Sequence, residues 1–268
     1  MQKPAALRPR PVRRDAVASQ TSVRDALNPF ERFNHIVVEG PIGVGKTSLA
    51  SALASRFGAQ TQLEAPQENP FLSRFYQEGE RWALATQLHF LFQRIDQLSP
   101  IDARARSNAP IVGDFLIDKD SLFAHLTLDD DELALYERIV AAQSLNLPSP
   151  DLVIYLQASA QHLLDRVSRR GISMEKGISA EYLAALSERY TRFFHHYDGS
   201  PLIIVNTDHW NPVDRSDDFE LLIEQMVGMR GRRAQRPICF GCFPNWRFRA
   251  SGGSCRSPKI AWCVEKAG

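Results

Sequence analysis

The stretch Gly40–Thr47, GPIGVGKT, constrains this chain more than any other. It fits the pattern G-x-x-x-x-G-K-[ST], in which glycines let backbone N–H groups turn toward a phosphate. The β-branched run 35–39 before it predicts a buried strand, and the run 48–54 after it predicts a helix. Because a phosphate-binding loop needs this strand–loop–helix context, the sequence predicts such a loop leading into a helix N-terminus.

Each residue type in this loop has an expected task. Lys46 reaches the β- and γ-phosphates of a nucleotide, and the hydroxyl of Thr47 binds Mg²⁺. The other expected nucleotide contacts come from the loop and the first helical turn: Gly40, Gly43, Val44, Gly45 and Ser48. The pattern therefore indicates a nucleoside triphosphate bound together with Mg²⁺.

Charge is distributed unevenly along the 268 residues. Residues 35–229 carry 16 Lys or Arg against 27 Asp or Glu, whereas both ends of the chain are basic. An acidic centre argues against nucleic acid as a partner, because nucleic-acid binding needs a basic face. No apolar run approaches the roughly 18 residues that a membrane span requires. We therefore expect small-molecule partners, with no nucleic acid and no membrane.

Apolar runs predict four further strands, at residues 61–64, 109–114, 150–156 and 201–206. Helical patterns lie between and after them, at 71–99 with a possible break at Gly79, and at 159–170, 179–197 and 219–229. Strands that alternate with helices predict an α/β fold, with a five-stranded parallel sheet covered by helices on both faces.

The two ends of the chain are predicted to lie outside this domain, which spans residues 35–229. Residues 1–34 indicate a disordered basic extension, with an organelle transit peptide as the alternative. Residues 230–268 lack periodicity and indicate an unstructured basic tail that holds all four cysteines. A zinc site there is disfavoured because Cys255 and Cys263 stand too far apart. A cysteine-free domain favours a reducing compartment, so we expect the cytoplasm, with the mitochondrion as the alternative.

Carboxylates follow two of the predicted strands. Glu64 ends the second strand and Asp114 ends the third, where ligands bind in open α/β sheets. Glu64 is a candidate general base, or otherwise a solvated loop residue. Asp114 is a candidate for assisting Mg²⁺. The next charged residues, at 118–120, suggest no definite role.

Two groups of polar side chains on helices have alternative interpretations. Gln87 and Arg94 stand seven residues apart and share a helix face, so they either read a nucleobase edge or form a solvated edge. Arg166, Arg169 and Arg170 either complement a helix C-terminus or clamp a triphosphate. Gly171 and Gly177 bracket the next segment and favour its movement as an arginine-rich lid.

In series, these motifs resemble the deoxynucleoside kinase family, which contains the deoxycytidine, deoxyguanosine and deoxyadenosine kinases, within the P-loop NTPase superfamily. The resemblance covers about residues 35–229. It is carried by the loop at 39–47, by Leu63-Glu64-Ala65-Pro66, by Tyr76, Glu80-Arg81-Trp82, Gln87 and Arg94, and by Tyr155-Leu156-Gln157-Ala158, Arg166, Arg170-Gly171, Glu175 and Gly177-Ile178.

The resemblance implies a role for each matched residue. Glu64 takes the proton of the deoxyribose 5′-hydroxyl, while Tyr76 and Glu175 hold the 3′-hydroxyl. Gln87 and Arg94 read the base. The implied catalytic cations are Lys46, Arg166 and Arg170, which stabilise charge on the transferred phosphoryl group. The loop that contacts adenine falls near Asp208, and the family resemblance also implies a homodimer through helices of the core.

The chain departs from the family pattern at two positions. The family often has an acid-Arg-Ser motif after the third strand, whereas this chain has Asp114, Phe115 and Leu116. A lid position that is often Arg is Ile172 here, and Arg169 is the candidate replacement.

The expected function is an ATP-dependent deoxynucleoside kinase that uses Mg²⁺ and slightly favours a purine deoxynucleoside. One alternative is a thymidylate-like nucleoside monophosphate kinase, which would need an extra cationic site for the acceptor phosphate. Another is a non-catalytic nucleotide-binding protein, suggested by Phe115 and Ile172. A GTPase-type switch would want D-x-x-G and N-K-x-D motifs, and the chain has neither.

Overall fold

The structure is a computed structural model that describes residues 27–105, 109–143 and 149–235. Most of the N-terminal extension and the four cysteines lie outside these residues. The transit-peptide and zinc hypotheses therefore stay untested.

A parallel six-stranded sheet forms the centre of the described domain, with strand order β2-β3-β1-β4-β5-β6. The strands are β1 (His35–Glu39), β2 (Gln60–Gln62), β3 (Ile111–Gly113), β4 (Leu152–Gln157), β5 (Leu202–Asn206) and β6 (Arg233–Gln235). The predicted α/β fold is confirmed. Helices join successive strands, which lets all of them run parallel. β1 lies between β3 and β4, and the loop that follows β1 opens at the carboxyl edge of the sheet.

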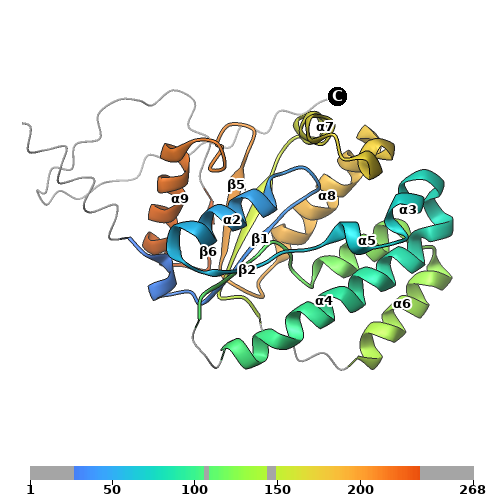
Figure 1. The fold of residues 1–268 in the computed structure, drawn as a ribbon, viewed down its shortest axis with the longest axis horizontal. Coiled ribbons are helices and arrows are strands. Elements are labelled where there is room, and N and C mark those ends of the chain that lie inside the picture. Colours follow the sequence, from blue (N-terminus) through green and yellow to red (C-terminus); the bar gives the residue numbers. More distant parts are fainter. Residues whose placement is uncertain (1–26, 106–108, 144–148, 236–268) are drawn as a thin grey trace, which may run out of the picture. The chain divides into compact units, whose positions relative to one another are not determined.

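Helices cover the sheet (Figure 1). The α-helices are α2 (Lys46–Phe57), α3 (Leu72–Glu78), α4 (Ala83–Ala105), α5 (Lys119–Thr127), α6 (Asp130–Ala142), α7 (Ala160–Arg170), α8 (Ala180–His196) and α9 (Ser216–Gly228). Short 3₁₀ turns are η1 (Pro29–Glu31), η2 (Pro66–Glu68), η3 (Gly79–Trp82) and η4 (Ser173–Gly177). The predicted break at Gly79 is confirmed, since this residue ends α3 with φ +60°.

Side-chain caps explain where several helices begin. Ser159 accepts a hydrogen bond from the N–H of His162 at the start of α7, and Ser179 does the same for Tyr182 at the start of α8. Each cap satisfies an N–H that has no partner within its helix. The two helices on either side of the expected lid are therefore delimited by local sequence.

Two expectations about the edges of the domain were wrong. The sheet has six strands rather than five, because residues 233–235 of the expected tail pair with β5. At the other end, Phe30 and Phe33 of the expected disordered extension pack against the core. Each segment is too short to show a period, and the folded sheet edge or helix surface provides its partner.

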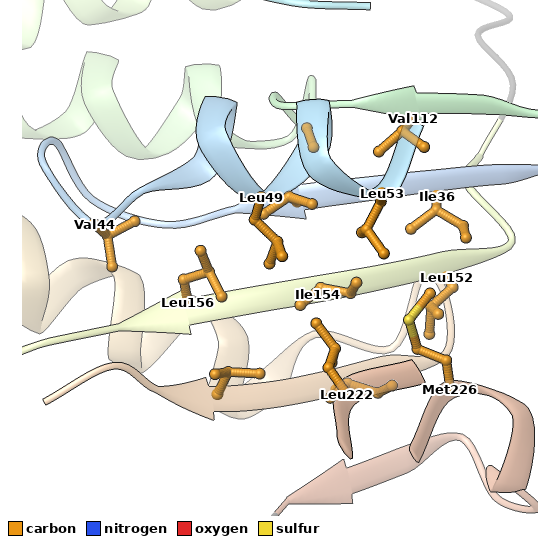
Figure 2. Packing of buried hydrophobic residues seen from close by; sticks show 14 of the residues in the cluster. Ile36, Val44, Leu49, Leu53, Val112, Leu152, Ile154, Leu156, Leu222 and Met226 are labelled. Atoms are coloured by element: carbon orange, nitrogen blue, oxygen red, sulfur yellow. The ribbon is translucent and has the colours of Figure 1, made fainter. Parts of the chain in front are cut away.

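The core on one face of the sheet joins α2 and α9 to the central strands. Figure 2 shows Leu49 and Leu53 of α2 pointing toward the side chains of β4, with Leu222 and Met226 of α9 on the other side of them. These side chains are all essentially buried. Burying each contributes about 1.5–3 kcal/mol to stability, so this core holds the start of α2 firmly against β1.

The other face is covered mainly by α8 and α5. Tyr155 of β4 stacks on Phe194 of α8 with ring centroids 4.2 Å apart, and Tyr190 stacks beside them. Leu122 of α5 joins the same cluster. Beyond this layer, α4 runs beside α5 and α6 (Figure 1). The packing holds α4, α5 and α8 around the carboxyl edge of β1 and β3.

Candidate active site

The loop between β1 and α2 has the backbone that its sequence predicts. Gly43 and Gly45 have φ of +82° and +105°, a region that favours glycine. A side chain at Gly43 would also meet Val167 of α7 at 2.9 Å. The glycines therefore permit both the turn and the close approach of α7.

Lys46 and Thr47 begin α2 at this loop. The ammonium of Lys46 donates to the backbone oxygens of Gly40 and Pro41, at 2.8 and 3.2 Å. Burial lowers its pKa, and the nearby ammonium of Lys119 lowers it further. An ammonium held in a buried loop next to a helix N-terminus is well placed to attract phosphate oxygens.

Thr47 and Asp114 meet where the first turn of α2 approaches the end of β3. The Thr47 hydroxyl donates to Oδ2 of Asp114 at 2.5 Å, and the other oxygen of Asp114 accepts the N–H of Glu64 at 2.7 Å. Asp114 is buried. Two hard oxygen ligands so close together suit Mg²⁺, which often takes one or two protein oxygens and completes its shell with phosphates and water. Within the described ranges no cluster of three or more His, Cys, Asp or Glu side chains forms a metal site.

Glu64 lies between two cations. Arg94 donates from Nη2 to Oε1 of Glu64, and Lys119 donates to Oε2 at 3.1 Å. Burial alone raises the pKa of Glu64, but Lys119, Arg94 and Lys46 lower it more, to about 2. Glu64 is therefore an ionised, partly buried carboxylate and not a solvated loop residue.

Arg94 also contacts a second carboxylate. Its Nη1 donates to Oδ1 of Asp120, and Arg94 and Asp120 are both buried. Burial raises the pKa of Asp120 to about 6, although Arg94 opposes this. The solvated-edge interpretation of Arg94 was wrong: its seven-residue spacing from Gln87 places both inside one cavity.

The cavity that contains Gln87 and Arg94, named the acceptor cavity from here on, has a volume of about 130 Å³. It is lined by the predicted residues Glu64, Tyr76, Gln87, Arg94, Asp114, Arg170 and Glu175, together with Gly43, Lys46, Thr47 and Lys119. Aromatic side chains, among them Phe90 and Tyr182, form its walls. Gln87 donates to the hydroxyl of Thr127 at 3.2 Å, and burial raises the pKa of Tyr76. Aromatic walls with a few polar groups are a lining that suits a planar ring attached to a sugar.

A second cavity of about 540 Å³ opens on the other side of the loop. Its lining includes the predicted loop residues Val44, Gly45 and Ser48, the arginines 166, 169 and 170, and Asp208. Gly43, Lys46, Thr47 and Arg170 line both cavities. The loop therefore separates two binding spaces that share the phosphate-binding side chains.

The arginines at the end of α7 differ in their partners. Arg166 donates from Nη1 to the hydroxyl of Thr207 at 2.9 Å and to the Val44 oxygen at 3.2 Å. Arg170 pairs with Glu175 of η4, donating from Nη2 at 2.5 Å. Arg166 is thus fixed beside the loop, whereas Arg170 links the end of α7 to the segment expected to form the lid.

Asp208 lines the second cavity and contacts residues at the start of α7. Its carboxylate accepts the N–H of Ser159 at 3.0 Å and contacts Nδ1 of His162 at 2.6 Å. Burial raises the pKa of Asp208, but His162 and Ser159 lower it overall. The side chain therefore has protein partners, and its expected contact with adenine stays a prediction.

Sequence reasoning missed Lys119 and Asp120 as site residues, and also Glu39. The side chain of Glu39 is fully buried, and its Oε2 accepts the N–H of Leu116 at 2.7 Å. The charged run at 118–120 was the available signal. It was not usable, because only the packing of α5 against α4 and α8 shows which of its charges face the cavity.

No helix within the described part of the chain combines the length and apolar character needed to cross a bilayer.

Comparisons with known proteins support one family. Residues 36–229 match the sequence profile of the deoxynucleoside kinases. The chain is 36% identical over 156 residues to the deoxyguanosine kinase of Bacillus subtilis, covering 58% of this chain and 75% of that one. It is 32% identical over 216 residues to the deoxyadenosine kinase of Dictyostelium discoideum, covering 78% and 86%.

A solved structure agrees with this. The deoxyadenosine kinase from M. mycoides, with the products dCMP and a flexible dCDP bound, superposes with a TM-score of 0.63 at 25% identity. The match covers 73% of this chain and 100% of that one. Together with the two cavities that meet at the phosphate-binding loop, these matches show that the chain belongs to the deoxynucleoside kinase family, phosphotransferases that act on a hydroxyl acceptor.

Proposed function

We propose that this enzyme transfers the γ-phosphate of ATP to the 5′-hydroxyl of a deoxynucleoside, with Glu64 as general base. The observation that carries this proposal is the pair of cavities sharing Lys46 and Thr47, with Glu64 on the acceptor side only. With a nucleoside in the acceptor cavity and ATP in the second cavity, the acceptor and the donor lie on opposite sides of the loop. Phosphoryl transfer depends mainly on such positioning and on cations.

The charges divide the work of the reaction. Glu64 takes the proton of the 5′-hydroxyl, as the hydroxyl oxygen forms its bond to the γ-phosphorus and the bond to ADP breaks. Lys46, Arg166 and Arg170 stabilise negative charge on the phosphates. Thr47 and Asp114 would hold Mg²⁺, which would neutralise negative charge on the nucleotide's phosphates.

The acceptor-side residues position the nucleoside. Tyr76 and Glu175 hold the 3′-hydroxyl, and Gln87 and Arg94 read the base. Gly177, at the end of η4, lies against the backbone of Tyr76, so the segment from 171 to 177 acts as a lid over the sugar. On the donor side, Asp208 orders the loop beside the adenine.

An uncharged acceptor is favoured over a monophosphate by the pairing of cations. Lys46 is assigned to the phosphates of ATP. The other cations in the described lining of the acceptor cavity, Arg94, Lys119 and Arg170, each contact at least one carboxylate. A nucleoside monophosphate would need a cation whose charge is not already matched in this way. We therefore rank the monophosphate kinase second.

A purine deoxynucleoside is the preferred acceptor in this proposal. The support comes from relatives named deoxyguanosine kinase and deoxyadenosine kinase. A buried guanidinium and a carboxamide in the same cavity also match the donor and acceptor groups on a base edge.

We further propose that the enzyme acts as a cytoplasmic homodimer, with neither nucleic acid nor membrane as a partner. Phe92 of α4 and Leu135 of α6 are large apolar side chains that stay 45% and 44% exposed. A second copy packing on these two adjacent helices would bury them. Sedimentation of the wild type against Phe92→Glu tests this, and a wild-type monomer at micromolar concentration would refute it.

The function is tested by measuring ATP consumption with deoxyadenosine, deoxyguanosine, deoxycytidine and thymidine, each beside its monophosphate. We expect turnover on a nucleoside, strongest with a purine, and loss of at least 100-fold in Glu64→Gln. Glu188→Gln, which changes an exposed glutamate of α8 in the same way, serves as the matched control. Turnover on monophosphates alone would overturn the proposal.

A further inference from the structure

The family resemblance places an arginine directly after the carboxylate that ends β3, and this chain has Phe115 there. Phe115 is buried in an apolar cluster with Leu98 and Ile111. It lines a different cavity, of about 520 Å³, together with Asp118 and Tyr136, and it does not line the acceptor cavity. A side chain at position 115 therefore points away from Glu64 in this fold.

Lys119 provides a positive charge at Glu64 from four residues further along the chain. It is the first residue of α5 and is only 3% exposed. Its ammonium lies 3.1 Å from Oε2 of Glu64 and 3.8 Å from Oε2 of Glu39. The side chain lines the acceptor cavity. Two carboxylates within 4 Å offset the cost of burying this ammonium.

The turn that presents Lys119 is fixed to the sheet. Glu39 at the end of β1 accepts the N–H of Leu116, and the Leu116 oxygen accepts the N–H of Lys119 at 3.2 Å. Glu39 also accepts the hydroxyl of Tyr190 at 3.1 Å and the N–H of Gly40 at 2.8 Å. One buried carboxylate thus ties the phosphate-binding loop, α8 and the start of α5 together.

We propose that Lys119 is the positioning residue for Glu64, in place of the arginine that is absent at position 115. This rests on the proposed function, because it assigns Lys119 a task only if Glu64 is the general base. Lys119 holds Oε2 of Glu64, so that the carboxylate faces the 5′-hydroxyl whose proton it takes. Arg94, which holds the other oxygen, has the separate task of reading the base.

The test compares kcat and KM of Lys119→Met and Lys119→Arg with those of the wild type. We expect Lys119→Met to lower kcat about 100-fold while KM for ATP changes less than threefold. The reason is that Lys119 contacts the general base Glu64 and not the nucleotide. The kcat of Lys119→Arg should be at least tenfold higher than that of Lys119→Met. Asp118→Asn is the matched control, since Asp118 neighbours Lys119 but lines the other cavity.

Two readouts separate positioning from general support of the fold. A positioning role predicts a loss in kcat with KM for ATP nearly unchanged, and recovery when arginine restores a cation at position 119. Asp118→Asn should change neither kinetic parameter.

The outcomes distinguish the two proposals. An active wild type with an equally active Lys119→Met variant overturns the role of Lys119 alone. A wild type that phosphorylates no deoxynucleoside overturns the proposed function as well. Should Lys119→Met not fold, as judged by loss of the ATP-induced rise in Tm, the contact is measured in folded protein. The ¹⁵N signal of the Lys119 ammonium should then shift in Glu64→Gln and not in Glu188→Gln, and an unchanged signal overturns the contact.

Discussion

Arg94 donates to Oε1 of Glu64 while also donating to Asp120, so that one buried guanidinium joins two carboxylates from different parts of the chain. Arg94 comes from α4, Glu64 follows β2, and Asp120 lies on α5. Only 4% of the Arg94 side chain is exposed. The proposed base reader and the proposed general base are therefore electrostatically coupled.

Replacing Arg94 should destabilise the fold as well as the reaction. Arg94→Met leaves Asp120 and Glu64 with fewer partners in a buried site, and we expect a loss of about 3–5 kcal/mol in the free energy of unfolding. Urea denaturation measures it. The control is Arg192→Met, whose pairing with Glu188 is exposed, where about 1 kcal/mol or less is expected. Equal losses in the two variants would contradict this coupling.

Acid should weaken the protein through Glu64. Its folded-state pKa, about 2, is below the ordinary value of 4.5, so its stabilisation is fully present above pH 4.5. It is lost as the pH falls toward 2, and the total is about 3 kcal/mol. Measured by urea unfolding from pH 6 to 3, the wild type should therefore lose stability more steeply than Glu64→Gln. Parallel curves for the two proteins would show that Glu64 keeps an ordinary pKa.

The contact between Thr47 and Asp114 predicts how metal dependence changes. Asp114→Asn removes the charge that Mg²⁺ favours, so half-maximal turnover should need about 10- to 100-fold more Mg²⁺. Thr47→Ser keeps the hydroxyl and should need less than threefold more. A titration of MgCl₂ at fixed ATP measures both. If Asp114→Asn needs no more Mg²⁺ than the wild type, the proposed metal site is wrong.

Gly177 tests the contact between the lid and the sugar site. A Cβ at this position would lie 2.5 Å from the backbone oxygen of Tyr76, so Gly177→Ala must push η4 away from α3. We expect KM for the deoxynucleoside to rise about tenfold with a smaller change in KM for ATP. Gly58→Ala, with nothing within 4 Å of its added Cβ, is the control for a simple backbone effect. Steady-state kinetics with each substrate varied distinguish the two.

Much of the domain was predictable because its signals are local. The loop at 40–47 needs only its own glycines, the strand before it and the helix after it. Glu64 and Asp114 were found because parallel strands bring their carboxyl ends to one edge, so a polar residue at a strand end points to the site. Gln87 and Arg94 followed from helical spacing.

Other features depended on partners far away in the sequence. β6 has three residues and a basic character, and it exists as a strand because β5 offers an unpaired edge at that place. Between the acids at 118 and 120, nothing in the local sequence indicates that Lys119 faces the site. Its direction is decided by the turn that Glu39 holds and by the packing of α5 between α4 and α8.

The sequence by itself determined the phosphate-binding loop, the alternation of strands and helices, and the chemical types available for phosphoryl transfer, since these depend on neighbouring residues and short periods. Only the tertiary structure decided which charges meet. Beside Arg94, the second cation at Glu64 comes from position 119 and not 115. Contacts within 4 Å depend on how separate elements pack, and a spacing along the chain does not specify that packing.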